Sequence, residues 1–205
     1  MRGVLASVRD IVPIRPLSVT ESLDLAERQA DLLLELSGVS APPVPETAIT
    51  GVPRLEVERL YPSPVSGAAQ WRRGRWLILL KASEPPARQR FTLAHEFKHI
   101  LDHPFIDVLY PSVCTMTREQ RAEHVCDHFA ACLLMPRRWL AAEIDRSGLH
   151  PARLARQFGV SHTALSRRLR ALGYQYDTHP HHSQRKEPTH ASNRRTRRRC
   201  HLVAN

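Results

Sequence analysis

The chain has 205 residues, of which 42% are hydrophobic and 24% charged, and its formal net charge is +10. This composition is typical of a soluble globular protein with a hydrophobic core. Apolar runs such as Trp76 to Leu80 are far shorter than the ~20 residues of a membrane helix. Arg9 and Asp10 interrupt the first residues too early for a secretory signal. We therefore expect a soluble, cytoplasmic protein with no membrane partner.

The predicted elements alternate between helices and short strands. A helix begins at Ser18, which has capping-box spacing to Glu21, and stops at Gly38. A proline-marked connection leads to the elements that follow. In chain order we expect a strand, the two strands of a β-hairpin and three helices, at residues 54–61, 66–71, 76–82, 91–103, 117–134 and 138–145. This order predicts an α+β fold, mainly helical with a small antiparallel sheet.

The helix through 91–103 carries the sequence FTLAHEFKHILDH. Residues four apart share a helix face, so His95 and His99 lie together, opposite an apolar stripe that includes Phe97 and Leu101. His-Glu-x-x-His on a helix is typical of two zinc ligands with a general base between them in the sequence, here Glu96. His103 lies ~12 Å further along the axis, so we expect it to have a role at the helix end instead.

The helix at 117–134 offers two pairs of possible ligands. Glu123 and Asp127 flank its predicted buried stripe and point toward a neighbouring helix, whereas His124 and His128 face solvent. Glu123 is therefore the expected third ligand. Asp127, one turn later, is placed to accept the free N–H of a ligating histidine. Two histidines and one glutamate with an open fourth position indicate a hydrolytic site for one Zn²⁺ per chain.

The four cysteines do not form a zinc or disulfide framework. No Cys-x-x-Cys pair occurs, and Cys126 and Cys132 lie on one predicted helix. We interpret them as reduced thiols that mostly fill the core.

Two segments, RFTLAHEFKHILDHP and AEHVCDHFAACLLMP, resemble the ImmA/IrrE family of metallopeptidases, and the likeness extends over roughly 46–174. The resemblance implies that His95, His99 and Glu123 bind zinc and that the substrate is a helix-turn-helix repressor, in mobile-element immunity or DNA-damage responses. Lys98 departs from the commonest pattern, in which a small residue is found. We expect it to alter the rim of the cleft and leave the metal unaffected.

The sequence LARQFGVSHTALSRRLRALGY, at 154–174, predicts a helix-turn-helix lobe in which Ser161 caps the second helix. DNA contact by that helix is one interpretation, and the resembling family does not require it. The other is a small lobe packed on the peptidase. The candidate DNA contacts, all expected to be exposed, are His162, Thr163, Ser166, Arg167 and Arg170. Arg168 occupies a position that is often apolar.

The last segment, 177–205, contains seven lysines and arginines, two acidic residues and five histidines. We predict a disordered basic tail, either simply solvated or attracted to nucleic acid. The expected organisation is an N-terminal helical segment with a proline-rich linker (1–45), a zinc metallopeptidase domain (46–147), the lobe (148–176) and the tail (177–205).

Three functions follow from these features. The first is a zinc endopeptidase that cleaves a transcriptional repressor. The second is a DNA-binding regulator whose metal site is not catalytic. The third is a toxin–antitoxin component that binds its partner without cutting it.

Overall fold

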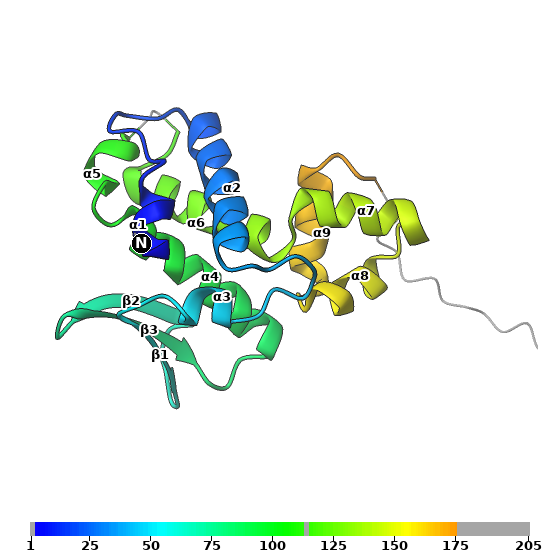
Figure 1. The fold of residues 1–205 in the computed structure, drawn as a ribbon, viewed down its shortest axis with the longest axis horizontal. Helices are drawn as coiled ribbons and strands as arrows, with labels where there is room; N and C mark the ends of the chain where they lie inside the picture. The colour runs from blue at the N-terminus through cyan, green and yellow to red at the C-terminus, as the bar shows by residue number, and fades with distance from the viewer. Residues whose placement is uncertain (1–2, 113–114, 176–205) are drawn as a thin grey trace, which may run out of the picture. The chain divides into compact units, whose positions relative to one another are not determined.

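The computed structural model describes residues 3–112 and 115–175, and these belong to one compact unit. The predicted tail, Cys114 and Cys200 lie outside the described residues. The predicted α+β class is confirmed (Figure 1). The elements are α1 (Val4–Arg9), α2 (Val19–Leu36), α3 (Thr47–Thr50), β1 (Leu55–Leu60), β2 (Gly67–Arg72), β3 (Arg75–Lys81), α4 (Pro86–Asp102), α5 (Ile106–Leu109), α6 (Arg118–Leu134), α7 (Arg137–Ser147), α8 (Pro151–Phe158) and α9 (His162–Ala171).

The three strands form one sheet in the order β1-β3-β2. The predicted hairpin is present. Its turn places Arg73 and Gly74 at φ of 51° and 79°, the conformation of a tight two-residue hairpin turn. The prediction of an antiparallel sheet is correct for β2 with β3 and wrong for β1, which pairs parallel to β3. Because the hairpin occupies one edge of β3, β1 takes the other edge, and β2 is left as an edge strand.

The core lies between α4 and its neighbours. One side of α4 packs against α6, and β2 and β3 cover another side (Figure 1). On its other flank α6 packs against α2. Phe97 of α4 and Phe129 of α6 are fully buried, with ring centroids 6.4 Å apart. This arrangement brings two helices that are separate in the sequence into direct contact along their predicted apolar stripes.

The helices α2 and α6 both begin with side-chain caps. Ser18 and Glu21 form the predicted capping box of α2, and Thr117 forms another with Gln120 at the start of α6. Each cap satisfies backbone N–H groups that the first turn of a helix leaves unpaired. The short helices α1, α3 and α5 are additional to the predicted elements, because segments of four to six residues carry too little periodicity to be recognised.

The predicted turn between α8 and α9 is also present. Gly159 adopts the left-handed conformation at φ 64°, and the Ser161 hydroxyl accepts a hydrogen bond from the Ala164 N–H at 3.1 Å. Phe158, Leu165 and Leu169 are buried. We refer to the described residues after α7, 148–175, as the C-terminal lobe.

Two arginines attach this lobe to the rest of the unit. Arg90 of α4 donates from Nε to the Gly159 carbonyl (3.2 Å) and from Nη2 to the Val44 carbonyl (2.7 Å). Arg168 of α9 is buried, and donates to the Met135 carbonyl (3.2 Å) and to Glu27 Oε1 (3.0 Å). Arg168, at a position that is often apolar in such lobes, is therefore a structural link from α9 to α2 and α6.

Within the described ranges, every helix is too short or too polar to cross a membrane.

Candidate active site

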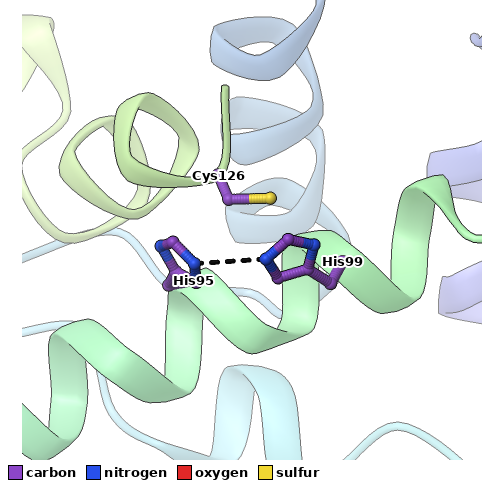
Figure 2. Close-up of side chains that lie close together, drawn as sticks. All are labelled: His95, His99 and Cys126. Carbon is purple, nitrogen blue, oxygen red and sulfur yellow. Dashed lines mark hydrogen bonds between the residues drawn. The ribbon is translucent and has the colours of Figure 1, made fainter. Parts of the chain in front are cut away.

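The two histidines of α4 share one face, as predicted, and their rings meet edge to face with centroids 5.0 Å apart (Figure 2). The opposite face of the helix is in the core, where Phe97, Ile100 and Leu101 are fully buried. The imidazoles are partly buried, with 15% of the His95 side chain and 26% of the His99 side chain exposed. The amphipathic pattern of α4 thus holds both rings at the boundary between core and solvent.

The side chains of the three predicted ligands converge beside α4. The Nε2 atoms of His95 and His99 are 3.2 Å apart. Glu123 of α6 places Oε2 3.2 Å from His95 Nε2 and Oε1 3.2 Å from His99 Nε2. Zinc bonds of 2.0–2.2 Å at tetrahedral angles separate neighbouring ligand atoms by about 3.3–3.5 Å. The three predicted ligands therefore fit one zinc ion.

Asp127 accounts for the orientation of the first imidazole. Its Oδ1 lies 2.9 Å from His95 Nδ1. A proton held at Nδ1 leaves the Nε2 lone pair directed at the point that His99 and Glu123 share. Burial opposes protonation of His95, but the hydrogen bond to Asp127 and the nearby carboxylates raise its pKa. The same hydrogen bond lowers the pKa of Asp127. The pair is thus a carboxylate–histidine couple of the kind that orients metal ligands.

The side chain of Glu96, on α4, lies beside Gly67 at the edge of the sheet. Burial raises the pKa of its carboxyl, with a further contribution from Glu123, while His95 acts in the opposite direction. Gly67, at the start of β2, lies so close that a Cβ atom there would be 2.3 Å from Thr92 Cγ2 and 3.0 Å from Glu96 Oε1. Gly67 was not among the predicted site residues, although a glycine in a strand is a signal of close approach.

Cys126 has a position that its sequence context did not reveal. It is buried, as predicted for a core-filling thiol, and burial raises its pKa well above the usual range. Its sulfur also lies within 4.8 Å of the ligand nitrogens of His95 and His99 (Figure 2). One turn of α6 thus presents Glu123 to the imidazoles from one side and a neutral thiol from the core side.

One side of this group of residues opens into a cleft of about 770 Å³. Its walls come from the beginning of β2, from α4 and α6, and from α9 of the C-terminal lobe. His95, Glu96, Glu123 and Asp127 all contribute to the lining. The volume is in the range of pockets that hold ligands, and two of the predicted metal ligands, His95 and Glu123, are open to it.

The structure disperses the five candidate DNA contacts. Thr163 and Arg167 are exposed and line the cleft, while His162 and Arg170 are exposed without lining it. Ser166 is buried at 6% exposure, so the expectation that it faces solvent is wrong. Its position on α9, adjacent to the core residue Leu165, turns it inward.

Lys98 is also not where we expected it. It is fully buried, and its Nζ lies 2.5 Å from Asp102 Oδ1 and 2.7 Å from Gln29 Oε1. The Tyr110 hydroxyl donates to the other oxygen of Asp102. The predicted place at the rim of the cleft is therefore wrong. Lys98 lies on the core side of α4, where it forms an ion pair with Asp102.

The three other histidines of α6 and the end of α4 differ in their surroundings. His103 caps the end of α4 as predicted, and its ring packs against Trp76 at 5.0 Å. His124 is exposed, as expected. His128 is half-buried, because α2 and Arg168 cover that side of α6, so its predicted solvent position is wrong.

His128 belongs to a second cluster of possible ligands. Glu27 of α2, His128 and Cys132 place ligand atoms within 4.8 Å of one another. Two arginines form ion pairs with Glu27: Arg168 Nη2 lies 3.0 Å from Oε1, and Arg137 Nη2 lies 3.4 Å from Oε2. At the first cluster, no arginine of the described residues forms an ion pair with Glu123, whose ion-pair partners are His95 and His99.

Fold and site together define the class: an α+β protein with a His-Glu-x-x-His helix and a distant glutamate, the arrangement of a metallopeptidase. A family model described as the IrrE N-terminal-like domain, Peptidase_M78, matches residues 54–170. The chain therefore belongs to this family, and the match includes α8 and nearly all of α9.

Known proteins agree with this assignment. The chain is 30% identical over 148 residues to the radiation response metalloprotease IrrE of Deinococcus radiodurans and 37% identical over 94 residues to that of Deinococcus deserti. These alignments take in 67% and 43% of the chain but only 43% and 34% of the relatives. A solved structure of a Mycobacterium tuberculosis transcriptional regulator has a similar fold, with a TM-score of 0.58 and 15% identity over 82% of this chain and 52% of that one.

Proposed function

We propose that the chain is a zinc-dependent endopeptidase that hydrolyses a peptide bond in a helix-turn-helix transcriptional repressor. The observation that carries the proposal is the close grouping of His95, His99 and Glu123: the two Nε2 atoms are 3.2 Å apart, and each lies 3.2 Å from a different oxygen of the Glu123 carboxylate. Two imidazoles and one carboxylate are the protein ligands of a hydrolytic zinc site that keeps one position open.

The residues around these three predicted ligands have separate tasks. Zinc held there supplies Lewis acidity toward water and toward the scissile carbonyl. Glu96 accepts a proton from the attacking water at its carboxylate and passes that proton to the leaving amine. A carboxyl whose pKa is raised by partial burial holds a proton more readily than an exposed one, which suits the second transfer. Asp127 fixes the tautomer of His95 throughout.

The edge of the sheet is suited to align a peptide. β2 is an edge strand, and Ser66 and Gly67 at its beginning line the cleft next to Glu96. An extended substrate that pairs with this edge would gain backbone hydrogen bonds. The absence of a side chain at Gly67 keeps strand and general base in contact. A substrate strand there would pass directly over the carboxylate.

The choice of a repressor as substrate rests on the family to which the chain belongs. The two Deinococcus relatives are named radiation response metalloproteases, which describes those proteins. The proposal for this chain is tested by co-expressing it with helix-turn-helix repressors of its own genome and measuring whether one of them is shortened.

The decisive variant is Glu96→Gln, which keeps the size of the side chain and removes the base. We expect repressor cleavage to fall by about 10²–10⁴-fold, while zinc content, measured by mass spectrometry of the metal, stays at one ion per chain. His103→Gln, at the end of the same helix, is the matched control and should cleave normally. Full activity of Glu96→Gln would refute the proposal.

The same experiment separates the two other functions predicted from the sequence. A toxin–antitoxin component would bind the repressor without shortening it. A DNA-binding regulator would bind DNA in a salt-dependent way that survives removal of zinc by a chelator.

A further inference from the structure

The second helix of the C-terminal lobe faces the metal cleft. Thr163, Arg167 and Ala171 of α9 recur every four residues and Ala164 lies three residues before Arg167, so all four lie toward one side of the helix. All four line the cleft that contains Glu123 and Asp127 of α6. The face that would carry DNA contacts in a recognition helix is therefore a wall of the candidate active site.

This wall is held in place by buried hydrogen bonds. Arg168, 3% exposed, joins α9 to the end of α6 and to Glu27 of α2. Arg90, which precedes the metal-binding segment of α4, donates to the Gly159 carbonyl in the turn before α9. The lobe is thus attached through the metal helix and its neighbours, which fixes the distance between α9 and the ligands.

Arg167 presents its charge to the cleft. It is exposed, and within the described residues it forms no hydrogen bond or ion pair. Arg88 of α4 also lines the cleft and is exposed, with a long contact of 3.8 Å to Glu84. Both arginines lie close enough to Asp127 to act on its carboxylate. Two positive side chains from different elements thus lie near the carboxylate that orients His95.

We propose that α9 is a substrate-binding wall, and that Arg167, with Arg88, binds an acidic side chain of the peptide within a few residues of the scissile bond. A guanidinium binds a carboxylate through two parallel hydrogen bonds, so this contact would select Asp or Glu at one position of the substrate. The inference rests on the proposed peptidase function and adds a specificity to it.

The geometry favours a peptide over DNA at this face. A recognition helix reads DNA by entering the major groove with its exposed side chains. On α9, Ser166 is buried and Thr163 and Arg167 are in the cleft. The cleft also contains Glu96 and Glu123, so a segment bound at Thr163 and Arg167 lies next to the candidate catalytic residues. A volume of about 770 Å³ is in the range of pockets that hold ligands, which suits an extended peptide segment.

The test uses the zinc-loaded full chain and a library of chymotryptic peptides from a bacterial proteome, with cleavage sites identified by mass spectrometry. We expect Asp and Glu to be enriched about fivefold at one position near the cut, the strength of an exposed ion pair. Arg167→Glu should replace this preference with one for Lys and Arg, and Arg88→Ala should weaken it. Arg170→Glu, three residues later on the same helix and outside the cleft, should leave it unchanged.

The outcomes are distinct. Cleavage whose acidic preference survives in Arg167→Glu supports the peptidase and overturns the role of Arg167. Complete absence of cleavage by the wild-type chain overturns the peptidase and this inference with it. Loss of binding to a DNA duplex in Arg167→Glu, with peptide selectivity unchanged, would assign α9 to DNA instead. Circular dichroism and zinc content verify that each variant is folded and loaded.

Discussion

Among the described residues, two clusters of potential metal ligands include residues of α6, and one of the two has the surroundings of a metal site. The first joins His95 and His99 to Cys126, with Glu123 beside both imidazoles. The second joins Glu27 to His128 and Cys132. Both contain imidazole and carboxylate donors, and both are contributed by two helices packed side by side (Figure 1). The composition of the ligand set therefore does not distinguish them.

The charges around the two clusters do. The first is surrounded by carboxylates, since Glu96 and Asp127 lie beside the ligands. In the second cluster, Arg168 and Arg137 both form ion pairs with Glu27. Burial, then the charge of Arg168, lowers the pKa of His128 to about 4, and burial raises the pKa of Cys132 to about 12. A cysteine binds a metal as its thiolate, and guanidinium groups repel a cation, so the second cluster is a structural contact.

The largest effect expected from this contrast concerns zinc itself. Glu123→Ala removes one of three ligands and should weaken zinc binding by at least about 100-fold, since removal of even a supporting residue costs 10–100-fold. Glu27→Ala should leave zinc binding unchanged. Competition with a chromophoric chelator measures both affinities. Equal losses in the two variants would contradict our assignment of the clusters.

The orientation of His95 gives the next effect. Asp127→Asn keeps the shape of the side chain but weakens the hold on the Nδ1 proton, and should reduce zinc affinity by about 10–100-fold. The exposed Asp145→Asn on α7 serves as the control. The same titration applies. Unchanged affinity in Asp127→Asn would mean that the 2.9 Å contact does not orient the ligand.

Arg168→Met tests the second cluster as a structural contact. The substitution leaves Glu27 partly buried with only Arg137 as its partner, and removes the bond to the Met135 carbonyl. We expect the free energy of unfolding to fall by about 3 kcal/mol, measured by urea denaturation. Arg170→Met, on the exposed side of α9, should change it by less than about 0.5 kcal/mol. A stable Arg168→Met protein would show that the lobe is attached by other contacts.

The smallest effect concerns pH. His128 has a pKa of about 4 when folded and 6.5 when unfolded. Between these values the unfolded chain binds a proton that the folded chain does not, so stability is complete above pH 6.5 and falls as pH drops toward 4. Allowing for partial exposure, the loss is about 2 kcal/mol. His128→Gln should lose correspondingly less stability between pH 7 and 4.5 in parallel urea titrations. Identical pH slopes would contradict the buried, neutral state.

The amino-acid sequence by itself predicted that His95, His99 and Glu123 would come together, as they do in the structure. The interval of four residues between His95 and His99 sets them on one face of any helix, and the apolar stripe of α6 directs Glu123 to one flank. These are consequences of local periodicity, which does not depend on the rest of the fold. The hairpin turn at Arg73 and Gly74 and the caps at Ser18 and Ser161 are local in the same sense.

Only the tertiary structure decided which polar side chains are buried. Lys98, Arg168 and Ser166 were assigned to solvent or left unexplained, because a helical wheel has no knowledge of a second or third neighbour. Lys98 is stable in the core because Asp102 and Gln29 reach it, and Arg168 because Glu27, 141 residues away, does. Buried charges need partners, and a helical wheel does not show those that come from distant parts of the chain, such as Gln29 and Glu27. The same packing places α9 against the metal cleft.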